Sequence, residues 1–275
     1  MLAKAILITL PLLIPPLLGY YPTFIALMAI NLGLMAVAWH FMEKDGGWVS
    51  LGHSIPFGIS AYLFALNPQI TPLSFLSFLI LILLSFTGKR LFPFATFLAS
   101  VAFWQLSHYL IIDGRGGEEG FRVAISLPLA DLYVISATFF LLSYLGLELL
   151  SKSELGLKIM AVRDDEIAAR SIGISPILYR FFVFLLSSTL TSISGILHAL
   201  TFSHVSPTIF SPFYSLFPFV VSVISMGKRW IFLIGSLSVI TISHVLSSII
   251  PEAHYVLYSA ALMLFSAVKR DVEDS

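Results

Sequence analysis

The chain has 275 residues, of which 58% are hydrophobic and only 11% charged, and its mean hydropathy is +0.96. Soluble domains carry about 25% charged residues, and a soluble fold of this size would leave large apolar patches exposed. A formal net charge of zero gives no electrostatic support for nucleic-acid binding. The lack of cysteine excludes disulfides, thiol catalysis and cysteine-ligated metals. The composition therefore predicts an all-α integral membrane protein.

A helix that crosses about 30 Å of hydrocarbon needs roughly 20 apolar residues. By this criterion the chain is expected to form about ten transmembrane helices within a single domain, 1–275. The first is interpreted as a membrane helix rather than a signal peptide, because no small-residue cleavage site follows it. The predicted spans are 2–19, 23–42, 48–66, 71–88, 91–112, 128–150, 177–200, 209–226, 230–250 and 253–268.

Two of these spans contain helix-breaking residues. The first is interrupted by Pro11, Pro15 and Pro16, and the third, 48–66, follows two glycines and carries Pro56. Such breaks are tolerated at membrane depth only where protein or a water-filled cavity covers the freed backbone. The third segment is therefore expected either to span the membrane or to re-enter on one side.

The basic residues give an independent test of the span count. With the charged loop 151–176 placed in the cytoplasm, ten spans bring all 15 Lys and Arg residues except Arg115 and Arg122 to the cytoplasmic side. The positive-inside rule requires such a bias, which also puts both termini in the cytoplasm. In a nine-span alternative, 48–66 only dips into the membrane, Lys4 moves to the other side and most of the bias remains.

The charged loop contains a short predicted helix with recognisable ends. Asp164 is expected to be its N-cap. Asp165 and Glu166 then place negative charge in the first turn, where the helix dipole favours it. Gly173 stands where a glycine ends a helix, and Pro176 blocks continuation.

This helix has about eight residues and a length of about 12 Å, too short to be stable alone in water. Glu166 and Arg170 have the spacing of a favourable pair within the helix, and Ile167, Ala168 and Ile172 form one small apolar face. On the cytoplasmic side such a helix suits docking into a groove of a soluble protein. The alternative is a helix that lies on the lipid surface.

Two stretches carry a family resemblance. The first, 156–174, reads GLKIMAVRDDEIAARSIGI, and the second, 50–62, reads SLGHSIPFGISAY. Both resemble segments of the LivM-type permease subunits of branched-chain amino acid ABC transporters, which belong to the hydrophobic amino acid uptake family. Weaker similarities follow in the family's order at 116–120, in a predicted outer loop, and at 205–207. The chain departs from the family pattern at 67–69, 225–228 and 268–272.

The resemblance implies a permease subunit of an ABC importer in the plasma membrane, which moves branched-chain or related amino acids inward. The implied partners are two ABC ATPase subunits, a second, LivH-like permease subunit, an extracytoplasmic substrate-binding protein and the lipid bilayer. The chain itself is expected to carry no cofactor and no enzymatic activity, because ATP and Mg²⁺ bind to the ATPase subunits. In this family the loop is the coupling helix that seats on the ATPase, which implies that role for Arg163, Asp164, Asp165, Glu166, Ala169, Arg170 and Gly173.

Polar residues and glycines within the spans are candidates for the transport pathway, because polar groups at membrane depth are costly. The alternative for each is a contact between helices, since small residues let helices approach closely. No metal site is expected, because the histidines lack the spacing of a metal-binding motif. The pathway candidates are Asn31, Ser50, Gly52, His53, Gly58, Asp131, Ser188 and Ser192.

Other functions are weighed against this one. No phosphate-binding loop occurs, so ATP hydrolysis would have to come from separate subunits. A stand-alone secondary transporter of ten helices would normally show two similar halves and a functional charge at the midplane. A permease for urea or amides in the same family is a closer alternative. An intramembrane phosphotransferase is disfavoured, because 164–170 (DDEIAAR) lacks the glycine and the later paired aspartates of that signature.

Overall fold

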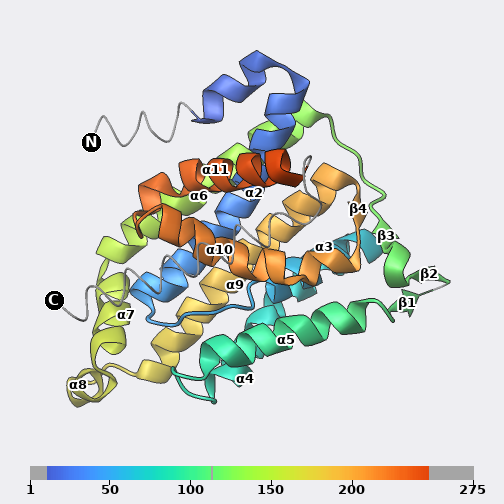
Figure 1. Cartoon of the computed structure of the whole chain (residues 1–275). Helices are drawn as coiled ribbons and strands as arrows, with labels where there is room; N and C mark the ends of the chain where they lie inside the picture. Colours follow the sequence, from blue (N-terminus) through green and yellow to red (C-terminus); the bar gives the residue numbers. More distant parts are fainter. Residues whose placement is uncertain (1–10, 113, 248–275) are drawn as a thin grey trace.

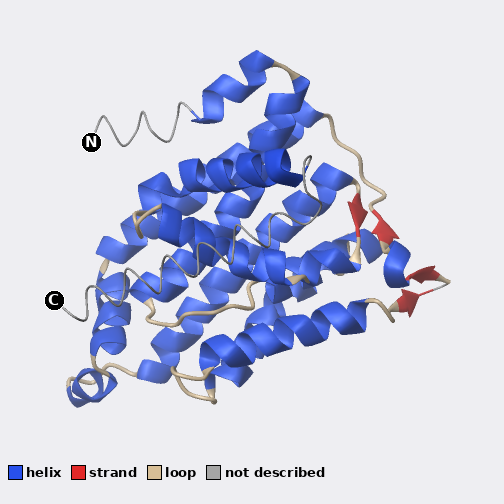
Figure 2. Cartoon of the chain, viewed as in Figure 1, coloured by secondary structure: helices blue, strands red, loops and turns tan. Residues whose placement is uncertain are grey.

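The computed structural model describes residues 11–112 and 114–247, and these residues form a bundle of helices (Figures 1 and 2). Residues 11–18 are helical and precede α2. The helices are α2 (Tyr20–His40), α3 (Ser54–Leu66), α4 (Phe78–Ser85), α5 (Phe92–Ser107), α6 (Leu129–Lys152), α7 (Glu154–Asp164), α8 (Glu166–Ser171), α9 (Pro176–Phe202), α10 (Pro212–Ile224) and α11 (Phe232–Ser247). The strands are β1 (Ile111–Ile112), β2 (Arg115–Gly116), β3 (Phe121–Arg122) and β4 (His204–Val205).

Four helical segments of the described chain are long and apolar enough to cross a membrane: Tyr20–Asp45, Leu129–Lys152, Pro176–Phe202 and Arg229–Ser247. Four shorter apolar segments accompany them: Ser54–Leu66, Thr71–Ser85, Phe92–Ser107 and Pro212–Ile224. The total of ten spans stays a prediction. The last predicted span, 253–268, lies outside the described residues, as do Lys4, Lys269 and Arg270.

Helix α2 lies at the centre of the bundle, with α6, α9, α10 and α11 packed around it (Figure 1). Its sequence is apolar on all sides, a pattern typical of a fully buried helix. Gly33 lets α6 and α11 approach closely, since a Cβ there would lie 3.1 Å from Ser236 Oγ and 3.3 Å from the Phe140 ring. This long apolar helix is therefore enclosed by protein.

Helices α3 and α9 cross in direct contact at Gly195. A Cβ at this position would overlap the carbonyl oxygen of Phe57 and the hydroxyl of Ser60 on α3. The glycine thus sets the separation of the two helices, as small residues do between membrane helices.

Gly195→Leu is expected to destabilise the purified protein by about 1–3 kcal/mol, because the added side chain must push two packed helices apart. Thermal unfolding followed by fluorescence measures the loss. Gly146→Leu is the matched control, since Gly146 lies on α6 with nothing within 4 Å of its Cβ position. An equal loss of stability in both variants would contradict this account of the crossing.

The predicted span 48–66 is not a single helix. Its first residues are irregular, and α3 begins only at Ser54. The irregular backbone is covered by protein: the Trp39 indole donates to the Ser50 carbonyl, and the Leu51 N–H donates to Thr96 Oγ1 at 3.0 Å. Neighbouring side chains thus satisfy the freed backbone groups, as membrane depth requires.

The two ends of the bundle differ in structure and charge. The strands lie at one end, on the right of Figure 1, whereas α7 and α8 lie at the opposite end, at the lower left. Arg163 donates to the Lys44 carbonyl and lies against Gly47 at the α8 end. Arg115 and Arg122 belong to the strands, which α3 reaches at its far end through contacts with β3 and β4. The segment before α3 together with α3 therefore runs from one end of the bundle to the other.

Candidate functional site

The charged loop folds into two helices rather than the one predicted. Helix α7 precedes α8, and the N-cap of α8 is Asp165, not Asp164 as predicted. Asp165 Oδ1 accepts hydrogen bonds from the backbone N–H groups of Ile167 and Ala168, at 2.8 and 3.0 Å. Asp164 instead ends α7, where its carboxylate lies 2.7 Å from the guanidinium of Arg163.

The Asp165 cap is an ionised carboxylate. The N–H groups of Ala168 and Ile167 stabilise its charged form and hold the pKa of Asp165 below its usual value. Because the pKa of Asp165 is lowered in the folded state, the cap contributes stability that is present at neutral pH and lost as the pH falls through that pKa. The start of α8 is therefore fully capped at physiological pH.

The end of α8 has the predicted form. Gly173 has φ +83°, its N–H donates to the Arg170 carbonyl, and the Ile174 N–H donates to the Ala169 carbonyl, both at 3.0 Å. These two bonds form the glycine-terminated helix end that the sequence indicates. Pro176 then begins α9.

Glu166 does not make the predicted pair with Arg170. Its carboxylate accepts a hydrogen bond of 3.0 Å from Arg180 on α9 and lies 3.7 Å from the ammonium group of Lys89, in the turn between α4 and α5. The Arg180 guanidinium in turn lies 4.7 Å from the centre of the Trp48 ring. Arg170 is exposed and takes part in no ion pair within the described chain. Glu166 therefore fastens α8 to the bundle instead of stabilising α8 internally.

The outer side of α8 is apolar and uncovered. Ile167 and Ile172 are 82% and 72% exposed, and Ile177 at the start of α9 is 73% exposed, whereas Ala169 faces the protein and is 2% exposed. Apolar groups this exposed, beside a helix fixed at both ends, are suited to a protein partner. The apolar face predicted from the sequence thus points away from the bundle.

A buried ion pair lies behind this surface. Asp45 Oδ2 and Arg229 Nη2 are 2.7 Å apart, and both side chains are less than 10% exposed. Ser151 donates to the same Asp45 oxygen at 2.7 Å and accepts from Arg229 at 3.1 Å. The cluster joins the π-helical turn Phe41–Asp45, which continues α2, and the end of α6 to the 3-10 turn Arg229–Ile231 before α11. Sequence reasoning missed it, because Asp45 and Arg229 resemble ordinary loop charges and lie far apart in the chain.

Most of the predicted pathway residues lie where α9 packs against α2 and against α3. His53 Nε2 lies 3.0 Å from Ser187 Oγ, which donates to the Ala38 carbonyl. Ser192 donates to the Pro56 carbonyl at 3.4 Å. We call this region the polar seam; its polar side chains are Asn31, His53, Ser187, Ser188, Thr191, Ser192 and His198. It holds side-chain and backbone groups from α2, from α9 and from α3 with the residue before it, and the sequence alone did not predict that they are close.

The remaining pathway candidates divide into two groups. Asn31 donates to Thr201 across the seam at 3.0 Å, the Ser50 hydroxyl accepts from the Gly52 N–H at 3.2 Å, and Gly58 lies against the ring of Phe210. Asp131, in contrast, is exposed in the first turn of α6, where its charge favours the helix start. The structure does not bring Asp131 into the seam.

Several buried polar atoms of the seam have no hydrogen-bond partner within the described chain. Buried polar groups without partners cost free energy, most of all at membrane depth. They mark a surface that water or a polar solute would stabilise if the helices separated. The seam atoms are Asn31 Oδ1, His53 Nδ1, Ser188 Oγ, Thr191 Oγ1 and His198 Nδ1.

The comparison with protein-family models agrees with these features, whereas no curated protein and no solved structure matches the chain. A family model described as "Branched-chain amino acid transport system / permease component" matches residues 21–267, which include α8 and the polar seam. The chain therefore belongs to the family of permease components of branched-chain amino acid transport systems, as its resemblance to LivM-type subunits indicates.

Proposed function

We propose that the chain is a permease subunit of an ATP-driven importer that carries branched-chain amino acids into the cell. Its proposed setting is the plasma membrane, with both termini in the cytoplasm. Its proposed partners are two ATPase subunits, a second permease subunit and an extracytoplasmic binding protein. The observation that carries the proposal is the exposed apolar side of α8, which the Glu166–Arg180 ion pair holds to the end of the bundle where basic residues gather.

The contacts of α7 and α8 suggest how movement of the ATPases would reach the pathway. Glu166 holds α8 to Arg180 on α9, and Arg163 holds α7 to the Lys44 carbonyl in the π-helical turn Phe41–Asp45 that continues α2. A displacement of α8 would therefore move two of the three helices that form the polar seam. Separation of those helices would expose the unpaired polar groups to the solute. ATP and Mg²⁺ would act on the ATPase subunits, and this chain would supply the mechanical link.

Reconstitution tests the proposal. Proteoliposomes that contain the chain with its ATPase and permease partners are expected to accumulate leucine only when ATP is on the ATPase side and binding protein is on the other. Uptake of urea or an amide in place of leucine would move the substrate class to the closest alternative. Uptake by the purified chain alone, driven by an ion gradient, would overturn the proposal in favour of a secondary transporter.

The α8 surface gives a second test. Ile167→Asp is expected to lower co-purification of the ATPase about tenfold or more, because a buried isoleucine contributes about 1.5–3 kcal/mol. Ile111→Asp is the matched control, since Ile111 is also a strongly exposed isoleucine, 66%, at the opposite end of the bundle. Both variants should insert into the membrane normally. ATPase binding that survives Ile167→Asp would place the docking surface elsewhere.

A further inference from the structure

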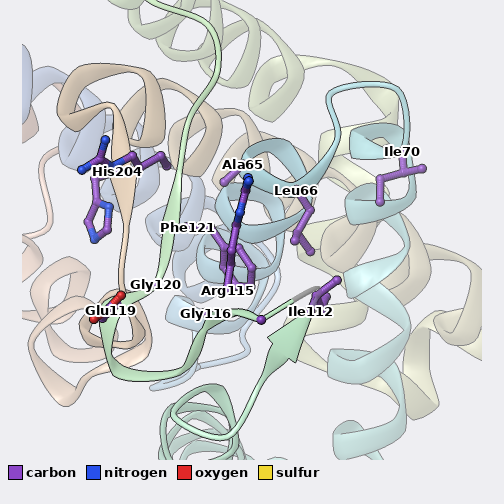
Figure 3. Close-up of a pocket in the computed structure, with 12 residues that line it drawn as sticks. Ala65, Leu66, Ile70, Ile112, Arg115, Gly116, Glu119, Gly120, Phe121 and His204 are labelled. Atoms are coloured by element: carbon purple, nitrogen blue, oxygen red, sulfur yellow. The ribbon is translucent and has the colours of Figure 1, made fainter.

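A large hollow opens at the strand end of the bundle, opposite α8 (Figure 3). It has a volume of about 1030 Å³ and lies between the end of α3, the β1–β2 hairpin and the β3–β4 pair. This volume is at the upper limit of the range of about 300–1,000 Å³ typical of small-molecule sites. Neither the polar seam nor the α8 surface includes it.

The hollow has one apolar and one charged side. Figure 3 shows Leu66, Ile70 and Ile112 on the right and His204 on the left, and Arg122 also lines the hollow. Arg122 and His204 are directly opposed residues of the β3–β4 pair, so their side chains point to the same face of that pair.

The charged side holds both signs of charge, and its groups are unpaired. Arg115, Glu119 and Arg122 line the hollow, yet none of them forms an ion pair within 4 Å in the described residues. Figure 3 places the Glu119 side chain below His204, apart from the Arg115 side chain at the centre of the view. Separated charges of opposite sign suit a ligand that carries both an anionic and a cationic group.

Glycines fix the shape of the wall. Gly116 and Gly120 both have positive φ, 106° and 70°. A Cβ at Gly116 would strike the Phe121 ring, and a Cβ at Gly120 would strike the backbone at Val205. The loop that carries Glu119 is therefore held close against β4, so the charged groups have a defined setting.

The floor of the hollow separates it from the polar seam. Phe121 packs edge-on against Tyr62 with ring centres 5.7 Å apart, and Tyr62 packs against Phe210 at 5.4 Å. Phe210 lies on Gly58, one of the predicted pathway residues. A layer of three aromatic rings thus stands between the hollow and the seam.

We propose that this hollow is a receiving site for a zwitterionic α-amino acid with an apolar side chain. The ligand's carboxylate lies toward Arg122 and Arg115, its ammonium group toward Glu119, and its side chain against Leu66 and Ile70. The aromatic floor holds the ligand outside until the bundle opens. This inference rests on the proposed function and assigns to it an outer substrate site of weak, on the order of millimolar, affinity.

Ligand analogues test each charge separately. The probes are leucine, 4-methylpentanoate, which lacks the ammonium group, and 3-methylbutylamine, which lacks the carboxylate. Saturation-transfer difference NMR on the intact transporter, without binding protein or nucleotide, measures their methyl signals. Leucine is expected to bind roughly fivefold more tightly than either analogue.

Two variants should remove this preference selectively. Glu119→Gln is expected to bring 4-methylpentanoate level with leucine, and Arg122→Gln to do the same for 3-methylbutylamine. Glu118→Gln is the matched control, because Glu118 is the adjacent carboxylate on the same turn and does not line the hollow. It should leave all three probes unchanged.

Two results would overturn the inference. One is the absence of a leucine signal in the wild-type transporter. The other is a loss of binding-protein affinity in the Glu119 and Arg122 variants with unchanged probe binding, which would make the hollow a protein docking surface. ATP-driven leucine uptake by the same preparation separates the two proposals: if uptake persists without probe binding, only the receiving site fails.

Discussion

Asp45→Asn is expected to abolish transport and to lower the stability of the protein by about 3–5 kcal/mol. The substitution keeps the size of the side chain but removes the carboxylate that lies 2.7 Å from the buried Arg229 guanidinium, and it leaves only the partly exposed Glu148, at 3.9 Å, as a counter-ion. Ser151 cannot compensate, because a hydroxyl carries no charge. Thermal unfolding and leucine uptake in proteoliposomes measure the two effects.

The controls for this prediction come from the chain itself. Glu154→Gln breaks an ion pair with Lys158 that is exposed on α7, and it should change neither unfolding nor uptake. The double variant Asp45→Leu/Arg229→Met should recover much of the stability, since a buried pair can be replaced by apolar groups at little cost. If it recovers stability but not uptake, the pair has a role in coupling beyond stability. A fully active Asp45→Asn variant would show that the cluster matters for neither.

Features of the loop that depend only on neighbouring residues could be predicted from the sequence. Gly173 ends α8 as expected because the positive φ and the two closing bonds involve only neighbouring residues. The predicted N-cap of α8, Asp164, is one residue too early, because Asp164 and Asp165 are equally good caps by residue type. In the structure Asp164 forms an ion pair with the neighbouring Arg163 instead. Helix α7 was missed, although Ser153 caps it and Glu154 lies in its first turn.

Long-range pairings could not be predicted in this way. Glu166 has a partner at the favourable spacing within its own helix, Arg170, yet it binds Arg180 on α9. The helix pair is worth only about 0.2–0.5 kcal/mol, so the tertiary contact beside Trp48 outweighs it. Asp45 and Arg229 give no sequence signal, because nothing local indicates that loop charges are buried.

Within the described residues, each predicted span from 23–42 to 230–250 corresponds to an apolar helical segment, but the boundaries differ. Hydropathy does not register that the backbone before α3 is unwound, or that 71–77 is a 3-10 helix. It also treats all spans alike, whereas α2 is enclosed by other helices and α6 is largely exposed. Burial depends on which helices pack together, and a single sequence does not contain that information in its composition.

Gly173→Val is expected to abolish ATPase binding and leucine uptake while the subunit still inserts into the membrane. Gly173 has φ +83°, which a β-branched residue adopts only with strain of about 1–3 kcal/mol. The strain is relieved most easily if the closing hydrogen bonds to the Ala169 and Arg170 carbonyls break and the C-terminal end of α8 changes its conformation. Space is not the obstacle, because nothing lies within 4 Å of a Cβ at this position.

The control for this experiment is a variant that adds a side chain of similar size with less backbone strain. Gly173→Asn adds a side chain of similar size, and asparagine tolerates positive φ better than other non-glycine residues. It should therefore retain most of the ATPase binding that Gly173→Val loses, as measured by co-purification and by uptake in the same proteoliposomes. Equal loss in both variants would mean that the surface at Gly173 itself meets the partner. Retention of binding and uptake in Gly173→Val would show that the shape of the α8 end is not what the ATPase recognises.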